Sequence, residues 1–129
     1  MGSISPSSTS YTRKVLVVDD EELILGVAVR ILKRLPLEVH TAKSGSEAVE
    51  KVASGAFDLV MLDLTMPEWD GRTTLLEIQR LRPGLPVVIM SGMSSAESVD
   101  VLRGAECQGF LPKPFSVADV RSLVQQMLV

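Results

Sequence analysis

Charged and hydroxyl side chains stand at the ends of short apolar runs in this sequence. Asp19 and Asp20 follow the first such run, and Asp63 ends a later one. Ser91 ends a further run, and Lys113 follows the last. If these runs are parallel strands, their carboxyl ends lie along one rim of the sheet, where open α/β folds bind ligands. We therefore expect these side chains to form a functional site.

The three aspartates, Asp19, Asp20 and Asp63, predict a metal site. Their carboxylates would converge within a few ångströms, which is unfavourable unless a cation neutralises them or one stays protonated. Mg²⁺ prefers oxygen ligands and commonly uses one or two carboxylates together with a substrate phosphate. Zinc is disfavoured because Cys107 and His40 lie far apart in the sequence. The expected cofactor is therefore Mg²⁺.

The ammonium group of Lys113 and the hydroxyl of Ser91 extend the chemistry expected at this rim. Carboxylates, a cation, an ammonium group and a hydroxyl donor suit phosphoryl transfer, which depends on positioning and on neutralising the phosphoryl oxygens. A carboxylate can itself be the nucleophile, which gives an acyl phosphate.

The sequence alternates short β-branched runs with longer helical patterns, which predicts an α/β fold with a parallel sheet and helices on both faces. Strands are expected at residues 14–19, 37–41, 57–63, 86–91 and 109–112. The first, third and fourth of these are almost wholly apolar, as strands covered on both faces must be. The second alternates polar and apolar residues, so we place it at an edge.

The helices are predicted from their start and stop signals. The first is expected from Glu22 to Leu35, since Pro36 cannot continue a helix. The last is expected at residues 117–128, where apolar side chains recur at helical spacing. Capping boxes are expected where Ser44 precedes Glu47, where Ser94 precedes Glu97 and, in weaker form, where Ser116 precedes Asp119.

Composition limits the classes of protein that this chain can represent. With 129 residues, 46% of them hydrophobic, it suits one domain, here residues 13–129. Residues 1–12 are nearly all small or polar and predict a disordered tail or linker. A net charge of -3 without a Lys/Arg cluster argues against direct nucleic-acid binding. A single cysteine and no apolar stretch of membrane length predict a cytoplasmic protein without membrane insertion.

Short motifs at the ends of the predicted strands together give the chain a family resemblance. The motifs are Asp19-Asp20, Leu62–Pro67 with Asp70-Gly71, Met90–Gly92 and Lys113–Phe115. In this order they resemble the receiver domains of response regulators, over about residues 14–128. The resemblance implies a doubly wound five-stranded parallel sheet of flavodoxin-like order 2-1-3-4-5 with five helices.

The resemblance also implies roles for the acidic residues. Asp63 matches the phospho-acceptor, which forms an aspartyl phosphate. Asp20 matches a direct Mg²⁺ ligand and Asp19 one that acts mostly through water, with Asp63 and the backbone carbonyl of Thr65 completing the protein's ligands. A simpler alternative is that Asp19 and Asp20 only cap the first helix.

Further roles follow from the same resemblance. Ser91 matches the switch hydroxyl that turns toward the phosphoryl group, and Phe110 the aromatic side chain whose rotamer follows it. Phe110 could equally be an ordinary core residue. Gly92 matches a small residue that leaves room for the donor. Lys113 matches the lysine that pairs with the phosphate oxygens, and in the family its peptide bond to Pro114 is cis.

The function expected from the resemblance is that of a phospho-acceptor domain in a two-component phosphorelay. The domain would catalyse only its own phosphorylation and dephosphorylation. The donor would be a sensor histidine kinase or a histidine phosphotransfer protein, because the chain holds no nucleotide loop. An effector would bind the face of the fourth helix, fifth strand and fifth helix, with candidate positions Ala118, Arg121, Ser122 and Gln125. Both a stand-alone regulator and the receiver of a hybrid sensor kinase fit.

The same residues bear on three other functions. An aspartyl-phosphate phosphatase of the haloacid-dehalogenase type needs a second aspartate two residues after its nucleophile, where this chain has Thr65. A flavin-binding module would need phosphate donors in the first loop, but Asp19–Glu22 would repel a phosphate. A receiver-like interaction module that does not use phosphate also fits. Trp69, close after Asp63, either reports on the site or packs on a neighbouring backbone.

Overall fold

The computed structural model describes residues 12–128 of the chain. Its strands are β1 (Arg13–Val18), β2 (Leu37–Ala42), β3 (Leu59–Asp63), β4 (Val87–Ser91) and β5 (Gly109–Pro112). Its helices are α2 (Glu22–Leu32), α3 (Gly45–Ser54), α4 (Gly71–Leu81), α5 (Ser95–Leu102) and α6 (Val117–Leu128). Apart from Thr12, the tail predicted over residues 1–12 lies outside the described residues.

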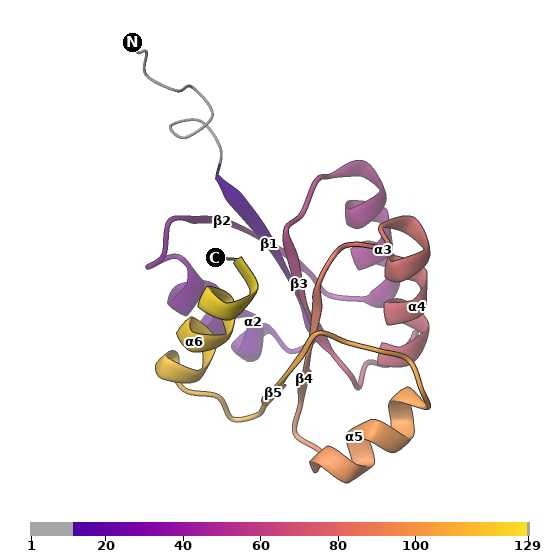
Figure 1. Cartoon of the computed structure of the whole chain (residues 1–129). Coiled ribbons are helices and arrows are strands. Elements are labelled where there is room, and N and C mark those ends of the chain that lie inside the picture. The colour runs from indigo at the N-terminus through magenta and orange to yellow at the C-terminus, as the bar shows by residue number, and fades with distance from the viewer. Residues whose placement is uncertain (1–11, 129) are drawn as a thin grey trace.

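The strands form one parallel sheet in the order β2-β1-β3-β4-β5 (Figure 1). This confirms the predicted topology, including the edge position of the second strand. The central strands β3 and β4 are buried at every position, which explains why their sequences are apolar runs rather than alternating ones. Because all strands run in one direction, their carboxyl ends share one rim.

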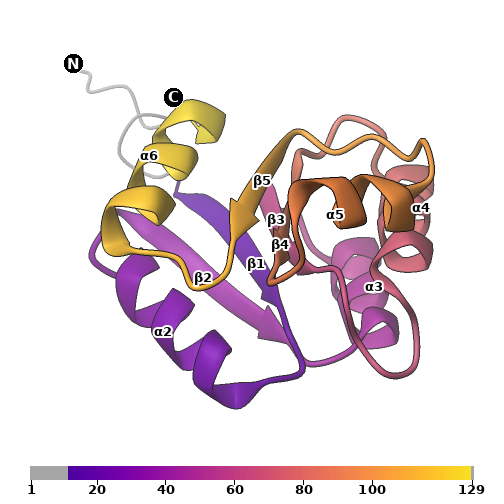
Figure 2. The ribbon, with the colours of Figure 1, turned by 90° about the horizontal axis from the view of Figure 1, so that it is seen from below.

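Helices cover both faces of the sheet, with α2 and α6 on one face and α3, α4 and α5 on the other (Figure 2). The two-residue period of β1 divides its side chains between these layers. Val15 and Val17 pack with the buried residues of α2 and α6. Leu16 and Val18 pack with those of α3, α4 and α5. The sheet is therefore the rigid middle layer from which the rim residues project.

Several element boundaries differ from the expected ones: β1, β2 and β4 by one residue at one or both ends, and α2 and β3 by more. Helix α2 ends at Leu32 rather than Leu35, because the next turn tightens: the Arg34 N–H donates to the Ile31 carbonyl at 3.2 Å and the Leu35 N–H to the Leu32 carbonyl at 2.9 Å. Strand β3 begins at Leu59 rather than Phe57.

The predicted capping boxes form to different extents. The pair Ser94 and Glu97 makes the complete reciprocal box. The Asp119 carboxylate likewise accepts from the Ser116 N–H at 3.1 Å, while the Ser116 hydroxyl accepts from the Asp119 N–H at 3.0 Å. At α3 the box is incomplete, since Glu47 bonds to the N–H of Lys43 and not to that of the capping serine.

None of the helices between residues 12 and 128 combines the length and the apolar character that crossing a membrane requires.

Candidate functional site

The rim at the carboxyl ends of the strands gathers the residues that the sequence singled out. Asp19 directly follows β1, and Asp63 and Ser91 are the last residues of β3 and β4. Lys113 directly follows β5, and its N–H donates to the Ser91 carbonyl at 2.8 Å. The register of the strands brings Asp63, Ser91 and Lys113 together. Asp63 pairs with Met90, the residue before Ser91, and Ser91 pairs with Pro112, the residue before Lys113.

Lys113 is the centre of the polar contacts at this rim. Its Nζ lies 2.7 Å from Asp19 Oδ2 and 3.2 Å from Asp63 Oδ1. The exposed carboxylate of Glu21 lies 3.9 Å away. Lys113 is followed by a cis peptide bond to Pro114, as the resemblance implied. An ammonium group is thus held between two buried carboxylates.

The three aspartates form the acidic cluster that the sequence predicted. One carboxylate oxygen from each of Asp19, Asp20 and Asp63 lies within 4.8 Å of the other two. Asp19 is fully buried and Asp63 is 4% exposed, whereas Asp20 is exposed. An all-oxygen donor set that is open to solvent on one side fits a hard divalent cation that keeps several water ligands.

The pKa of Asp63 is raised to about 6 by burial and, next, by the negative charge of Asp19. The attraction of Lys113 and a hydrogen bond from the Thr65 N–H act in the opposite direction. For Lys113, burial lowers the pKa, but the hydrogen bond to Asp19 and the charge of Asp63 outweigh it, so the pKa is raised. At neutral pH Asp63 is therefore mainly ionised beside a charged lysine.

The structure does not support the helix-capping alternative for the first two aspartates. The N-cap of α2 is Glu21, and no side chain caps the helix there. Asp19 instead accepts a hydrogen bond of 2.9 Å from the Glu21 N–H through Oδ1, while its Oδ2 binds Lys113. Asp19 therefore shapes the loop after β1 and points into the cluster.

Ser91 is almost fully buried, and its hydroxyl contacts its own loop and α5. Its Oγ accepts from the Met93 N–H at 3.0 Å and lies 3.3 Å from the hydroxyl of Ser98. Phe110 is half-buried against the core below α3, α4 and α5, so it lies in the layer behind the rim. Ser98 could not be predicted as part of the site, because a single serine inside a helix gives no signal of its own.

The loop between β3 and α4 is fixed by packing against two glycines. A Cβ at Gly45 would lie 2.8 Å from the Cβ of Trp69 and 2.3 Å from the hydroxyl of Thr74. A Cβ at Gly71 would lie 2.6 Å from the Cα of Leu64. Trp69 thus packs on the backbone at the start of α3, which was one of its two predicted roles.

An open hollow of about 490 Å³ borders the acidic cluster on the side of Asp20. The first turn of α3 and the loop after β3 form its walls, lined by Lys43, Ser44, Gly45, Ser46, Met66, Pro67 and Glu68. Gly92, whose small size was predicted to leave room, also faces open space, since a Cβ there would meet nothing within 4 Å. The cluster is thus accessible to a donor.

Comparison with known families decides the assignment. Residues 15–125 match the family described as response regulator receiver domain. This chain belongs to that family. It is 37% identical over 121 residues to the sensor kinase CckA of Brucella abortus (strain 2308), a match that covers 92% of this chain and 13% of that protein. It is also 34% identical to the DNA-binding transcriptional regulator NtrC of Azospirillum brasilense, over 88% of this chain and 24% of that protein.

Solved structures show the same fold. Chemotaxis protein CheY4 of Vibrio cholerae superposes on this receiver domain with a TM-score of 0.85 at 27% identity, covering 92% of this chain and all of that one. A CheY-like receiver domain protein from Methanospirillum hungatei gives a TM-score of 0.84 at 26% identity, over 90% and 93% of the two chains. The receiver therefore matches whole solved domains but only a small part of the curated relatives.

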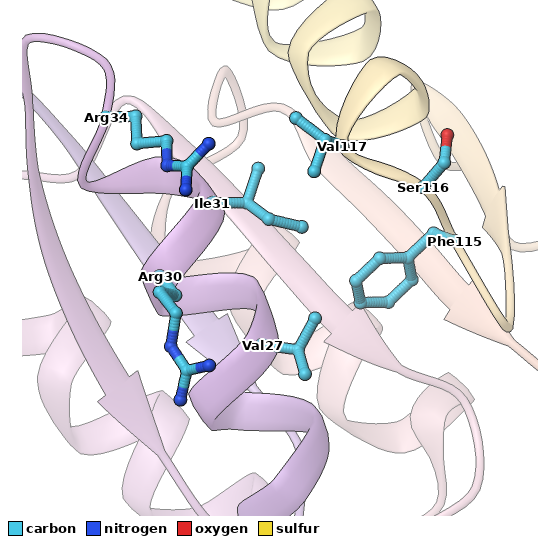
Figure 3. A pocket seen from close by; sticks show the side chains of 7 residues that line it. All are labelled: Val27, Arg30, Ile31, Arg34, Phe115, Ser116 and Val117. Atoms are coloured by element: carbon cyan, nitrogen blue, oxygen red, sulfur yellow. The ribbon is translucent and has the colours of Figure 1, made fainter.

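The receiver carries a further hollow, a groove of about 330 Å³ between α2 and the loop after β5 (Figure 3). Val27 and Ile31 of α2 point toward Phe115 and Val117 across this groove. Two exposed arginines border it, Arg30 of α2 and Arg34 of the turn that follows this helix, and Ser116 also lines it. Phe115 lies two residues after Lys113, in the loop that follows β5.

Proposed function

We propose that this receiver accepts a phosphoryl group on Asp63 from a phosphohistidine of a partner protein. The observation that carries the proposal is the position of Lys113, whose ammonium group contacts both Asp63 and Asp19 at 2.7 to 3.2 Å. The buried carboxylate can act as the nucleophile, and the ammonium group beside it is already positioned to bind the phosphoryl oxygens.

The chain's residues provide the transfer step as follows. An oxygen of the ionised Asp63 carboxylate attacks phosphorus, the new O–P bond forms, and the P–N bond to the histidine breaks. The imidazole nitrogen keeps the electron pair of that bond and takes a proton from solvent. Lys113 stays charged, as its raised pKa requires, and pairs with the phosphoryl oxygens. Ser91 turns its hydroxyl toward the same oxygens.

Asp19, Asp20, Asp63 and the backbone carbonyl of Thr65 would hold Mg²⁺. The mutual approach of three carboxylate oxygens within 4.8 Å supports this assignment. When bound, Mg²⁺ supplies positive charge that offsets the negative charge of the carboxylates and of the phosphoryl oxygens. Asp20 is the exposed member and leaves the cluster open toward the donor.

The donor would be a sensor histidine kinase or a histidine phosphotransfer protein that docks in the groove between α2 and the loop after β5. An apolar groove that borders the loop carrying Lys113 suits a helix that presents a histidine. The flanking Arg30 and Arg34 suit acidic side chains on that helix.

The output would be a change in the face formed by α5, β5 and α6. Ser91, Phe110 and Lys113 connect the rim to these elements. The candidate contact positions are exposed on α6: Ala118, Arg121, Ser122 and Gln125. The relatives differ in kind, since CckA is named a sensor kinase and NtrC a transcriptional regulator. Both a receiver within a hybrid kinase and one that controls a separate effector are in keeping with them.

The proposal is tested by incubating the protein with Mg²⁺ and acetyl phosphate and recording its intact mass. One added phosphoryl group is expected, and none after Asp63→Asn or in EDTA. Asp100→Asn is the matched control, because Asp100 is an exposed aspartate of α5 and its loss should leave the adduct intact.

A different result would redirect the proposal. An adduct that persists in Asp63→Asn would contradict the assigned acceptor. No adduct from acetyl phosphate or from any histidine kinase would favour the alternative of an interaction module that does not use phosphate. Rapid hydrolysis of other phosphate esters would favour the phosphatase alternative.

A further inference from the structure

A second buried serine contacts the hydroxyl of Ser91. Ser98 of α5 is 2% exposed, and its Oγ donates to Ser91 Oγ at 3.3 Å. The N–H of Met93 donates to the same oxygen at 3.0 Å. The Ser91 hydroxyl is therefore held by one contact from its own loop and one from a helix.

Helix α5 is anchored to the core mainly through its second half, where Leu102 is buried and Val101 packs against the core. Its buried residues are Ser98 and Leu102. At the carboxyl end, Arg72 adds a hydrogen bond of 2.9 Å from its Nε to the Leu102 carbonyl. Ser98 is the buried residue nearer the amino end, and the next residue, Val99, is 67% exposed. The position of the first turns of α5 thus depends on a contact with Ser91.

We propose that Ser98 is a positioning residue that couples the Ser91 hydroxyl to α5. The inference rests on the proposed function, in which Ser91 turns toward a phosphoryl group on Asp63. That turn removes the hydrogen-bond acceptor of Ser98 at a buried position. A buried hydroxyl without a partner is unfavourable, so either the turn is opposed or α5 shifts until Ser98 finds a new partner.

The coupling has a direction that can be measured. In the unmodified protein, Ser98 stabilises the resting orientation of Ser91, so anion binding at Asp63 has to overcome this hydrogen bond. Removing the Ser98 hydroxyl should therefore tighten anion binding by about fivefold, the size expected for one hydrogen bond. The effect should act only through Ser91.

The test uses beryllofluoride as a phosphoryl analogue and calorimetric titration at a fixed Mg²⁺ concentration. The proteins are the unchanged chain, Ser98→Ala, Ser91→Ala and the double variant. We expect about fivefold tighter binding in Ser98→Ala and no further change when Ser98→Ala is added to Ser91→Ala. Ser95→Ala, at an exposed position of the same helix, should bind as the unchanged protein does.

A second variant and a second readout guard against a folding defect. Ser98→Cys keeps nearly the same volume with a weaker donor and should also tighten binding. Without the anion, amide exchange in the first turn of α5 should be faster in Ser98→Ala and in Ser91→Ala alike. If Ser98 had a purely structural role, amide exchange in α5 would be faster in Ser98→Ala but not in Ser91→Ala.

Two sets of results would overturn the inference. If Ser98→Ala changes affinity equally with and without Ser91, or fails to tighten binding, Ser98 does not act through Ser91, although the proposed function stands. If the unchanged protein neither binds beryllofluoride nor becomes phosphorylated, both the inference and the proposed function are wrong.

Discussion

At the scale of single residues, Asp63 has a carboxyl group whose surroundings oppose its ionisation. Burial and the charge of Asp19 raise its pKa to about 6, above the ordinary value of 3.8. Between these two pH values the folded protein binds more protons at Asp63 than the unfolded chain does, so stability falls as pH rises. The stability that protonated Asp63 contributes is fully present below pH 3.8, and it is lost as pH rises through about 6.

Asp63→Asn should therefore stabilise the metal-free protein at pH 7.5, by on the order of 1 to 3 kcal/mol, because the ionised form no longer has to be buried. The gain should shrink as pH falls from 6 toward 4. Urea denaturation in EDTA at several pH values measures this difference in the free energy of unfolding. Asp100→Asn is the control, and its free energy of unfolding should not change with pH relative to that of the unchanged protein. A stability loss at pH 7.5 would show that the Lys113 contact outweighs burial.

Lys113 neutralises two buried carboxylates at once, and Mg²⁺ is expected to share that task. Lys113→Met keeps the length of the side chain but removes its charge. In EDTA it should lower the free energy of unfolding by roughly 3 kcal/mol, since Asp19 and Asp63 then lack their cationic partner.

Added Mg²⁺ should stabilise Lys113→Met more than it stabilises the unchanged protein, measured as the shift in thermal midpoint between EDTA and Mg²⁺. Phosphorylation of the variant by acetyl phosphate should nevertheless remain slow, because no ammonium group pairs with the phosphoryl oxygens. Equal Mg²⁺ stabilisation of both proteins would argue that the cation binds away from these carboxylates.

At the scale of elements, the start of α3 fixes the loop that carries Trp69. Gly45→Ala would place a Cβ 2.8 Å from the Trp69 Cβ and should destabilise the protein by about 1 to 3 kcal/mol, with a changed tryptophan emission. Gly26→Ala is the matched control inside α2, where a Cβ would meet nothing within 4 Å. It should stabilise by about 0.5 to 1 kcal/mol and leave the emission unchanged. Equal effects of the two changes would contradict the packing of Trp69 on α3.

The elements also show what the sequence could predict. The apolar runs of β1, β3 and β4 and the alternation in β2 predicted a parallel sheet with β2 at an edge, because burial on one or both faces acts on residues that are close in sequence. The full strand order was implied by the family resemblance and is the one observed. The contact of Gly45 with Trp69 and that of Ser91 with Ser98 could not be predicted in this way. They depend on how separate elements pack, and a glycine after a capping serine or a serine within a helix has a sufficient local explanation.

At the scale of the whole molecule, the acceptor and the groove between α2 and the loop after β5 have separable tasks. Acetyl phosphate needs only the rim, whereas a protein donor also needs a surface on which to dock. Arg30 lines that groove and lies outside the carboxylate cluster of Asp19, Asp20 and Asp63, so we expect charge reversal there to affect docking alone.

The test uses a purified histidine kinase that phosphorylates the unchanged receiver. Arg30→Glu should slow phosphoryl transfer from this kinase by about tenfold or more, and it should leave the rate of phosphorylation by acetyl phosphate unchanged. Arg80→Glu is the matched control, because Arg80 is an exposed arginine on α4, on the opposite face of the sheet. Rates from both donors are read as intact mass over time. If Arg80→Glu slows the kinase reaction as much as Arg30→Glu does, net charge rather than the groove governs the encounter, and the donor docks elsewhere.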